Sequence, residues 1–401
     1  MDTLRVRAYN VRFGDAILVS VPDKTSNGSP KMRHILIDVG NALGGKNDGG
    51  LDTVFEPVIE NILKVLDGEP LDLYIMTHEH MDHVQGLLYG ATKREEELNK
   101  ILKDELKVRY TWLTASADPD YYKNFPDAEK EKKKEKKLFN DISLYLEASG
   151  KLAAASPENA WFRALMHNNN SKTTDTYVDY LRNLATEEKT FYVHRETDLK
   201  GKHPFREAKL SIWAPEEDTS IYYGRFKPMA LNMTPGDGAE VPPALSAPIP
   251  PPGVDAGAFY DLVEARQNGY VENLLAIDKA KNNTSIVFCL EWRKWKLLFA
   301  GDAEVRSWKE MDKREVLEPV HFLKISHHGS HNGTPALELV EKIMPEDPPD
   351  TRKRLALVST CEKTYGGVPH SDTIKLLSKR CEVNSTEPLE NGDYLDLKFK
   401  G

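Results

Sequence analysis

The densest chemical signal in this sequence is a run of four metal-ligand side chains within six positions, His78-x-His80-x-Asp82-His83. Two histidines spaced two residues apart can converge on one cation, and the Asp and His that follow can serve a second cation beside it. A hydrogen-bonded polar loop is the structural alternative, but such loops are rarely so rich in ligand-type residues. The run therefore predicts a metal site with two cations.

A single aspartate, Asp302, follows the apolar run from Lys296 to Ala300. An isolated carboxylate at the tip of a buried strand is very costly, so we expect it to be paired, capped or metal-bound. Taken alone, a helix N-cap is its commonest explanation. Its place ahead of a histidine cluster makes it a candidate ligand and catalytic residue.

Two further histidine positions follow in the last third of the chain. His327 and His328 lie in Ser-His-His-Gly-Ser, after the apolar run from 321 to 325, and His370 lies just before what looks like a helix start at Ser371. Neighbouring side chains usually diverge, so we expect one member of the pair to bind metal, and we favour His327. His328 or His370 would then hydrogen-bond the substrate or protonate a leaving oxygen, with an ordinary loop histidine as the equal alternative for His370.

Short apolar strands must deliver these residues. The runs 71–76, 296–300 and 321–325 each end at a ligand cluster, and the first of them follows a helical pattern from Phe55 to Leu66 that Gly68 ends. Strand-like patterns also cover 4–9, 16–21 and 34–39. This succession of strands and helices predicts a layered α/β fold.

Two segments interrupt the pattern. Residues 115–207 are polar, contain a Lys/Glu run from 129 to 137, and predict a mostly helical insertion; we expect the charged run to be a solvated helix face rather than a nucleic-acid contact, because its glutamates offset the lysines. Residues 216–283 include the proline-rich stretch 242–252, which predicts a long loop that shapes the cleft. Both lie inside one domain that we expect to cover 1–401, and the helical insertion is the candidate surface for a protein partner or a second copy.

Net charge, cysteine content and the lengths of the apolar runs exclude some classes of protein but do not indicate a substrate. The 401 residues carry a formal net charge of −9, which argues against a general nucleic-acid coat protein but leaves room for a local basic groove. Three cysteines without C-x-x-C spacing indicate neither disulfides nor a thiolate site. There is no signal-peptide pattern, and no apolar run approaches the roughly 20 residues of a membrane helix. We expect a cytoplasmic protein that does not enter membranes.

The order of these motifs resembles the metallo-β-lactamase superfamily: H-x-H-x-D-H, then strand-Gly-Asp, then S-H-H-G-S, then P-H. Within it, the chain is most similar to the ComEC-type branch, named after the hydrolase domain of bacterial DNA-uptake channels. That branch's "V-x-x-G-D-A", "I-L-I-D-x-G" and "N-x-S-L-V" signatures resemble segments 11–16, 35–40 and 283–287. The likeness covers both ends of the chain and fails across the two insertions.

The resemblance implies an αββα sandwich of two similar halves with the metals at one edge. His78 and His80 would hold the first cation, and Asp82 and His83 the second. Asp302 would bridge the two cations, His327 would complete the second site, and Asp38 would orient the ligands from behind. The additional histidine ligand of many members is missing, because the strand expected at 209–213 ends in Ala-Pro; neither His194 nor His203 is favoured as its replacement.

Such a site would activate a water as hydroxide and neutralise charge on the attacked group. The resemblance favours a phosphodiesterase or nuclease that acts on DNA or RNA, with Asp82 and Asp302 taking part through two divalent ions. Zinc suits the mixed His and carboxylate set best, with manganese as the alternative. A hydrolase of lactones, thioesters or cyclic nucleotides, and an effector subunit gated by a partner, are the competing functions.

Overall fold

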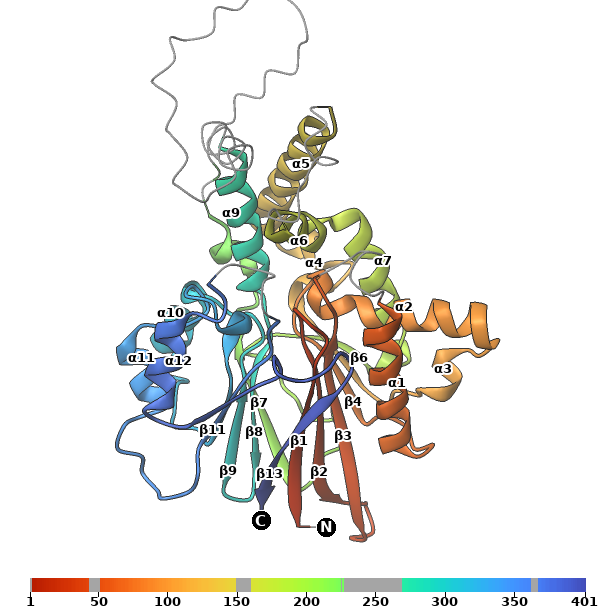
Figure 1. Ribbon diagram of the computed structural model, residues 1–401, viewed down its shortest axis with the longest axis vertical. Coiled ribbons are helices and arrows are strands. Elements are labelled where there is room, and N and C mark those ends of the chain that lie inside the picture. Colours follow the sequence, from red (N-terminus) through yellow and green to blue (C-terminus); the bar gives the residue numbers. More distant parts are fainter. Residues whose placement is uncertain (1, 43–50, 149–159, 225, 227–268, 362–366) are drawn as a thin grey trace, which may run out of the picture.

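Two β-sheets packed face to face form the centre of the molecule, with helices on both outer faces (Figure 1). This computed structural model describes residues 2–42, 51–148, 160–224, 226, 269–361 and 367–401. The layers follow the order helix, sheet, sheet, helix, so the predicted αββα sandwich is confirmed. Among the described helices, none is long and apolar enough to cross a membrane.

The first sheet has seven strands within the described residues, in the order β13-β1-β2-β3-β4-β5-β6. The strands from β13 to β3 run antiparallel to their neighbours, and those from β3 to β6 are parallel. Their bounds are β1 Thr3–Tyr9, β2 Ala16–Lys24, β3 Pro30–Val39, β4 Leu73–Met76, β5 Thr111–Thr114, β6 Thr190–Val193 and β13 Tyr394–Lys400. The terminal strands β1 and β13 are therefore neighbours.

The second sheet repeats this plan with six strands in the described part of the chain, in the order β12-β11-β10-β9-β8-β7. Antiparallel pairing joins β7, β8 and β9, and parallel pairing joins β9 to β12. The bounds are β7 Ala208–Ala214, β8 Val287–Trp292, β9 Trp295–Phe299, β10 Phe322–Lys324, β11 Leu355–Val358 and β12 Glu382–Ser385. In both halves the parallel strands point their carboxyl ends toward one edge.

Three apolar cores hold the layers together. The core between the sheets includes Ile17, Trp112, Phe288 and Phe322, all fully or almost fully buried. A second core joins the first sheet to helices α1 (Asp52–Leu66), α2 (Met81–Leu98) and α7 (Ser171–Arg182), and a third joins the second sheet to α10 (Val305–Lys313), α11 (Leu337–Ile343) and α12 (Ser371–Ser378). Burial of apolar area at these faces is the main stabilising term of the fold.

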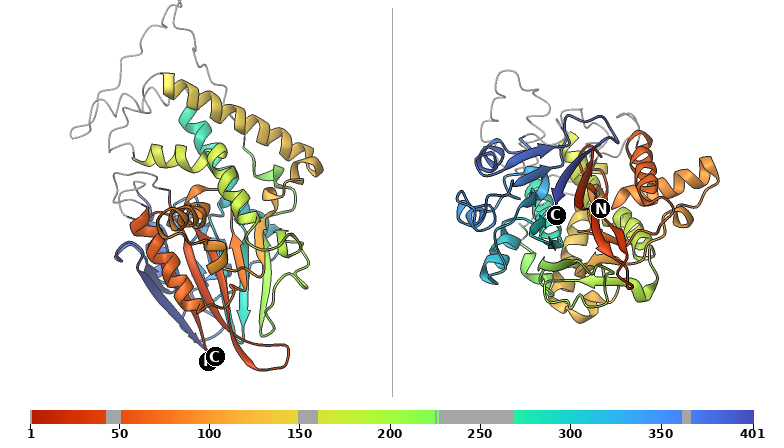
Figure 2. Two further views of the ribbon diagram at one scale, coloured as in Figure 1. Left: turned by 90° about the vertical axis from the view of Figure 1, so that its right-hand side faces the viewer. Right: turned by 90° about the horizontal axis from the view of Figure 1, so that it is seen from below.

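Further helices gather beyond the carboxyl ends of the strands, at the upper end of Figure 1 and of the left view of Figure 2. Of these, α4 (Tyr121–Asn124), α5 (Pro126–Ala148) and α6 (Ala160–Asn169) come from the predicted helical insertion 115–207, and α9 (Tyr270–Asn282) is the end of the segment 216–283. The proline-rich stretch 242–252 lies outside the described residues. Because β6 also falls within 115–207, that segment contributes to the first sheet as well.

The Lys/Glu run forms part of α5, but it is not solvated on every side. Lys132 and Glu135 are buried, and Lys132 Nζ lies 3.3 Å from Glu135 Oε1 and 3.9 Å from Glu79 Oε2. Lys281 Nζ of α9 lies 4.0 Å from Glu135 Oε1. The alternating charges let opposite partners meet inside the helical layer, which is why this part of the run can be buried.

Candidate metal centre

The first cluster occupies the loop between β4 and α2. His78 and His80 lie in that loop, and Asp82 and His83 lie in the first turn of α2, which begins at Met81. The helix packs tightly against the end of β3: a Cβ added at Gly40 would lie 2.2 Å from the backbone nitrogen of His83. Glycine is therefore required where the strand passes the ligand turn.

Asp38, at the end of β3, holds this turn in place. Its carboxylate accepts hydrogen bonds from the backbone and hydroxyl of Thr77, at 2.8 and 2.6 Å, and its Oδ2 lies 2.8 Å from His83 Nδ1. The contact at Nδ1 leaves His83 Nε2 directed toward the cluster. A carboxylate behind a ligating imidazole is a common arrangement in metal sites, because it fixes the ring's orientation.

The second sheet brings Asp302, which follows β9 after Gly301. Lys324, the last residue of β10, lies directly behind it: Nζ is 3.4 Å from Asp302 Oδ1, 3.2 Å from the Gly301 carbonyl and 2.5 Å from Asp15 Oδ2. The side chains of Lys324 and both aspartates are 1–2% exposed. Each of these charges therefore depends on the others for compensation.

His327 and His328 turn away from each other. Both have left-handed backbone angles, with φ of 48° and 52°, an unusual conformation for non-glycine residues. His328 is fully buried, and its Nδ1 lies 2.8 Å from the Ser359 carbonyl, so that Nε2 faces the aspartates. His327 points to the other side, where Nδ1 lies 3.3 Å from Glu304 Oε1. The structure thus brings His328, and not His327, into contact with Asp82 and Asp302.

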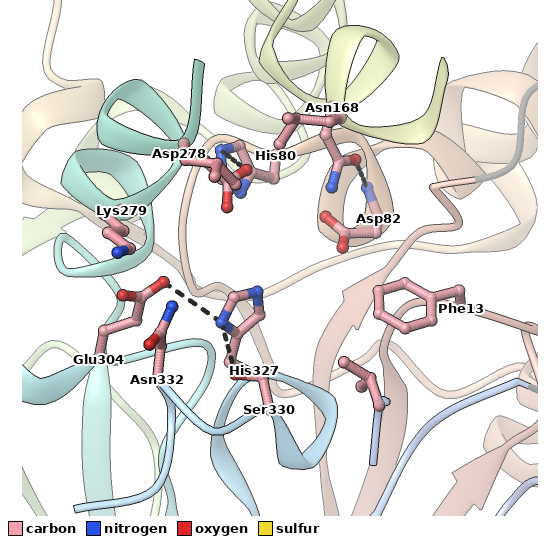
Figure 3. Close-up of a pocket in the computed structure, with 13 residues that line it drawn as sticks. Phe13, His80, Asp82, Asn168, Asp278, Lys279, Glu304, His327, Ser330 and Asn332 are labelled. Atoms are coloured by element: carbon pink, nitrogen blue, oxygen red, sulfur yellow. Dashed lines mark hydrogen bonds and ion pairs between the residues drawn. The ribbon is translucent and has the colours of Figure 1, made fainter. Parts of the chain in front are cut away.

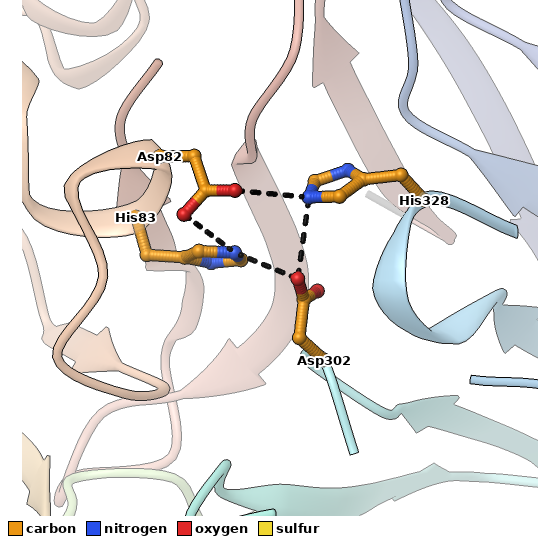
Figure 4. A group of neighbouring side chains, drawn as sticks. All are labelled: Asp82, His83, Asp302 and His328. Atoms are coloured by element: carbon orange, nitrogen blue, oxygen red, sulfur yellow. Dashed lines mark ion pairs between the residues drawn. The ribbon is translucent and has the colours of Figure 1, made fainter. Parts of the chain in front are cut away.

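Four side chains from the two halves converge in Figure 4: Asp82, His83, Asp302 and His328. His328 Nε2 lies 3.2 Å from Asp302 Oδ2 and 3.4 Å from Asp82 Oδ2, and His83 Nε2 lies 3.3 Å from the same Asp302 oxygen. One atom of each residue, Asp82 Oδ1, His83 Nε2, Asp302 Oδ2 and His328 Nε2, is buried without a hydrogen-bond partner. Buried polar atoms that lie so close together without a hydrogen-bond partner are suitable ligands for a metal ion.

A second donor group adjoins the first. His78 Nε2 and His80 Nδ1 lie 3.0 Å apart, and together with Asp82 they offer three ligand atoms within reach of one cation. The far nitrogen of the His80 ring, Nε2, lies 3.1 Å from Asn169 Oδ1 on α6. Asp82 is therefore common to both groups.

Electrostatics around the aspartates favour a cation. Burial alone would raise the pKa of Asp82 and Asp302, but His83 and His328 hold both below their usual range. Burial would likewise lower the pKa of His328, yet Asp302 and Asp82 raise it to about 9. The imidazoles thus serve as counter-charges to the buried carboxylates, a role that a bound metal ion fills more strongly.

The donors present fit a metal. Imidazole nitrogen and carboxylate oxygen are the ligand types of zinc sites, and both imidazoles of the four-residue cluster are held from behind at Nδ1. Polar atoms buried without a hydrogen-bond partner are costly unless something binds them.

Other candidate residues lie elsewhere. The ring of His370 stacks edge-on against His331 at 5.0 Å, and His370 belongs to none of the metal-capable groups among the described residues. His203 Nδ1 accepts a hydrogen bond from the backbone of Phe205, and His194 lies 3.9 Å from Glu217. The strand expected at 209–213 is β7, and it delivers no histidine.

Four residues near the metal groups were not expected. A lysine within the apolar run of β10 was a visible signal for Lys324, and Asp15 belongs to the quoted "G-D-A" signature. Asn169 and Asp278 come from the two insertions, where the sequence offers no pattern that points at the site. Asp278 Oδ1 lies 3.8 Å from His80 Nε2, and with Glu304 and His327 it forms a further donor group.

A cavity of about 420 Å³ opens directly onto the metal groups (Figure 3). His80 and Asp82 form part of its wall, with His327, Glu304 and Asp278 nearby. The cavity therefore gives a substrate access to the site from the side of His327.

No family model matches the sequence, and the search of curated proteins finds no relative. Among solved structures, a long form RNase Z from yeast is similar, with a TM-score of 0.32 and 10% sequence identity. The alignment covers 90% of this chain and 37% of that one, so this chain spans little more than a third of that protein's length. A TM-score of this size does not establish a shared fold, and the function must be argued from the site.

Proposed function

We propose that this chain is a metal-dependent hydrolase of the metallo-β-lactamase superfamily that cleaves phosphodiesters with two divalent cations. The observation that carries the proposal is the convergence of four buried ligand atoms from Asp82, His83, Asp302 and His328, which lie at ion-pair distance from one another and have no hydrogen-bond partner. The αββα layers and the order of motifs along the chain support it. The ComEC-type branch is the family we propose within that superfamily.

The two donor groups and the order of the motifs support a set of ligands. His78 and His80 would hold one cation, and Asp82, His83 and His328 the other. The superfamily resemblance implies that Asp302 is shared between the two cations, whereas Asp82 is the residue common to both donor groups. His328 thus takes the place that the sequence alone suggested for His327. We propose zinc, because the set mixes imidazole with carboxylate, and manganese is the alternative to be measured. When bound, such a pair acidifies a water and neutralises charge on the attacked phosphorus.

The chain's own residues orient this chemistry. Asp38 and the Ser359 carbonyl fix the rings of His83 and His328 through their Nδ1 atoms. Lys324 fixes Asp302 from behind. His327 lines the cavity beside the site, where it can contact a substrate oxygen. Burial of these side chains strengthens the charge interactions among them.

The test combines metal analysis with a panel of substrates. We expect about two zinc or manganese ions per chain and hydrolysis of bis(p-nitrophenyl) phosphate, with p-nitrophenyl acetate and a thioester as competing substrate classes. Asp82→Ala should lower the metal content and abolish hydrolysis. His321→Gln is the matched control, because His321 is a buried histidine that contacts Asp350 and not the site.

Two results would contradict the proposal. One is a purified protein that neither contains nor rebinds zinc or manganese. The other is a metal-loaded protein that hydrolyses the acetate or the thioester and leaves the phosphodiester intact.

A further inference from the structure

Helices α6 and α9 cover the metal groups. On α6, Asn168 Oδ1 accepts a hydrogen bond from the backbone of Asp82 at 3.1 Å, and Asn169 contacts the His80 ring. On α9, Asp278 accepts a 2.8 Å bond from the Asn169 amide, which joins the two helices above the site. The six residues of the two metal groups are at most 2% exposed: His78, His80, Asp82, His83, Asp302 and His328.

The cavity between these two helices and the metal groups is small. Its volume of about 420 Å³ lies near the lower end of the roughly 300–1,000 Å³ found for small-molecule pockets. A duplex can present a phosphate only together with its neighbours and the opposite strand. Since Asn168 and Asp278 stand over the ligands in Figure 3, a duplex backbone would collide with α6 and α9 before its phosphate reached Asp82.

The charges of the cavity also disfavour a polymer. Proteins that bind nucleic acid chains line the path with several Lys and Arg residues, which contact successive phosphates. Among the thirteen lining residues, all of them described, Lys279 is the one lysine and there is no arginine. Beyond the metal ligands, Asp278 and Glu304 add negative charge. Apart from the proposed metal ions and His327, a single lysine side chain suits a single phosphate group.

One part of the wall is apolar. Phe13, Leu165, Leu275 and Val368 all line the cavity. Leu275 is 39% exposed, which makes it one of the few large apolar side chains on the surface of the described chain. An aromatic or otherwise apolar group on the substrate would cover it, and a nucleobase has the required flat, apolar faces.

We propose that the site takes a small phosphodiester of about one nucleotide in size, with a planar or apolar group against Leu275 and the phosphate near Lys279, and that it excludes duplex nucleic acid. This inference rests on the proposed phosphodiesterase function and specifies its substrate class. It assigns α6 and α9 the role of a size filter over a metal site.

The experiment compares substrates on the metal-loaded full chain. We expect kcat/KM per phosphodiester to be at least about 100-fold higher for bis(p-nitrophenyl) phosphate than for a duplex oligonucleotide, since a misplaced phosphate loses rate on that order. Adenosine 5′-phosphate should bind in equilibrium dialysis, and the duplex should not compete with it. Equal or faster cleavage of the duplex, or its competition for binding, would overturn the size filter and leave the proposed function standing.

Leu275→Asp tests the apolar contact. It should lower kcat/KM for the aromatic diester about tenfold through lost apolar burial, with unchanged metal content. Leu98→Asp is the matched control, because Leu98 is 50% exposed at the far end of α2, about 24 Å along the helix from Asp82. Equal activity of the Leu275 variant and the wild type would refute the contact. If no phosphodiester is hydrolysed but an ester is, the proposed function itself fails.

Discussion

Replacing Lys324 by methionine should destabilise the protein more than any other single lysine substitution near the sheets. Burial alone would lower the pKa of Lys324, but Asp15 and Asp302 raise it above its ordinary value, so the side chain is a buried cation. At an effective dielectric constant of about 20, contacts of 2.5 and 3.4 Å correspond to Coulomb attractions of about 7 and about 5 kcal/mol. Desolvation of the three charges offsets most of this sum.

What remains after Lys324→Met is Asp15 without its nearest cation, and Asp302 with only the imidazoles of His83 and His328 beside it. Breaking a buried ion pair in this way costs about 3–5 kcal/mol, a large part of a typical folding free energy. We expect this loss in the free energy of unfolding, measured with urea both in excess zinc and after treatment with EDTA. Adding Asp15→Asn should restore about half of it, because one of the uncompensated charges is removed.

Lys296→Met on the neighbouring strand is the matched control. Lys296 pairs with Glu318 at a partly exposed site, with side chains 30% and 40% exposed, where ion pairs contribute about 0–1 kcal/mol. A loss below about 1 kcal/mol for Lys324→Met in both conditions would refute the reasoning. It would mean that Asp15 and Asp302 find other compensation.

Three further predictions concern the site and the pH dependence of stability. His328→Ala should lose about one of two bound metal ions, whereas His327→Ala should keep both; elemental analysis showing the reverse would return the ligand role to His327. Asp302→Asn should keep its circular dichroism spectrum and lose most activity, because charge compensation of the metal pair weakens, and near-normal turnover would show that Asp302 is not shared. Burial, with Arg5 and Lys31, lowers the pKa of His34 to about 4, so the folded state disfavours its protonation: stability is fully present above about 6.5 and falls by about 3 kcal/mol as pH drops to 4. His34→Gln should flatten that fall in urea titrations, and an unchanged pH dependence would contradict the assignment.

The layered fold could be predicted from the sequence because local patterns determine most of it. The runs 71–76, 296–300 and 321–325 became β4, β9 and β10, and the helical pattern from Phe55 to Leu66 became α1. The requirement for glycine at position 40 was not visible in the same way, because it comes from the backbone of Asp82 and His83, which is distant in sequence. The pairing of β1 with β13 was not visible, since nothing local marks two strands so far apart as neighbours.

The candidate site could be predicted in part. The clusters around His78 and Asp302 were found because several ligand-type residues fall together or at a strand end. The orientation of His327 and His328 could not be predicted, because it depends on left-handed backbone angles that the residue types do not reveal. Asn169 and Asp278 reach the site only through packing of α6 and α9, so their positions follow from tertiary structure alone.

The pairing of the first and last strands has a consequence for synthesis on the ribosome. Strand β1 needs β13 as its outer neighbour, yet 385 residues separate Tyr9 from Tyr394. At roughly 5–20 residues per second, the chain leaves the edge of β1 uncovered for roughly 20 to 80 s. A strand with free backbone groups is a template for unwanted pairing with other chains. This protein should therefore depend on chaperones during that interval more than a protein whose edge strands are neighbours in sequence.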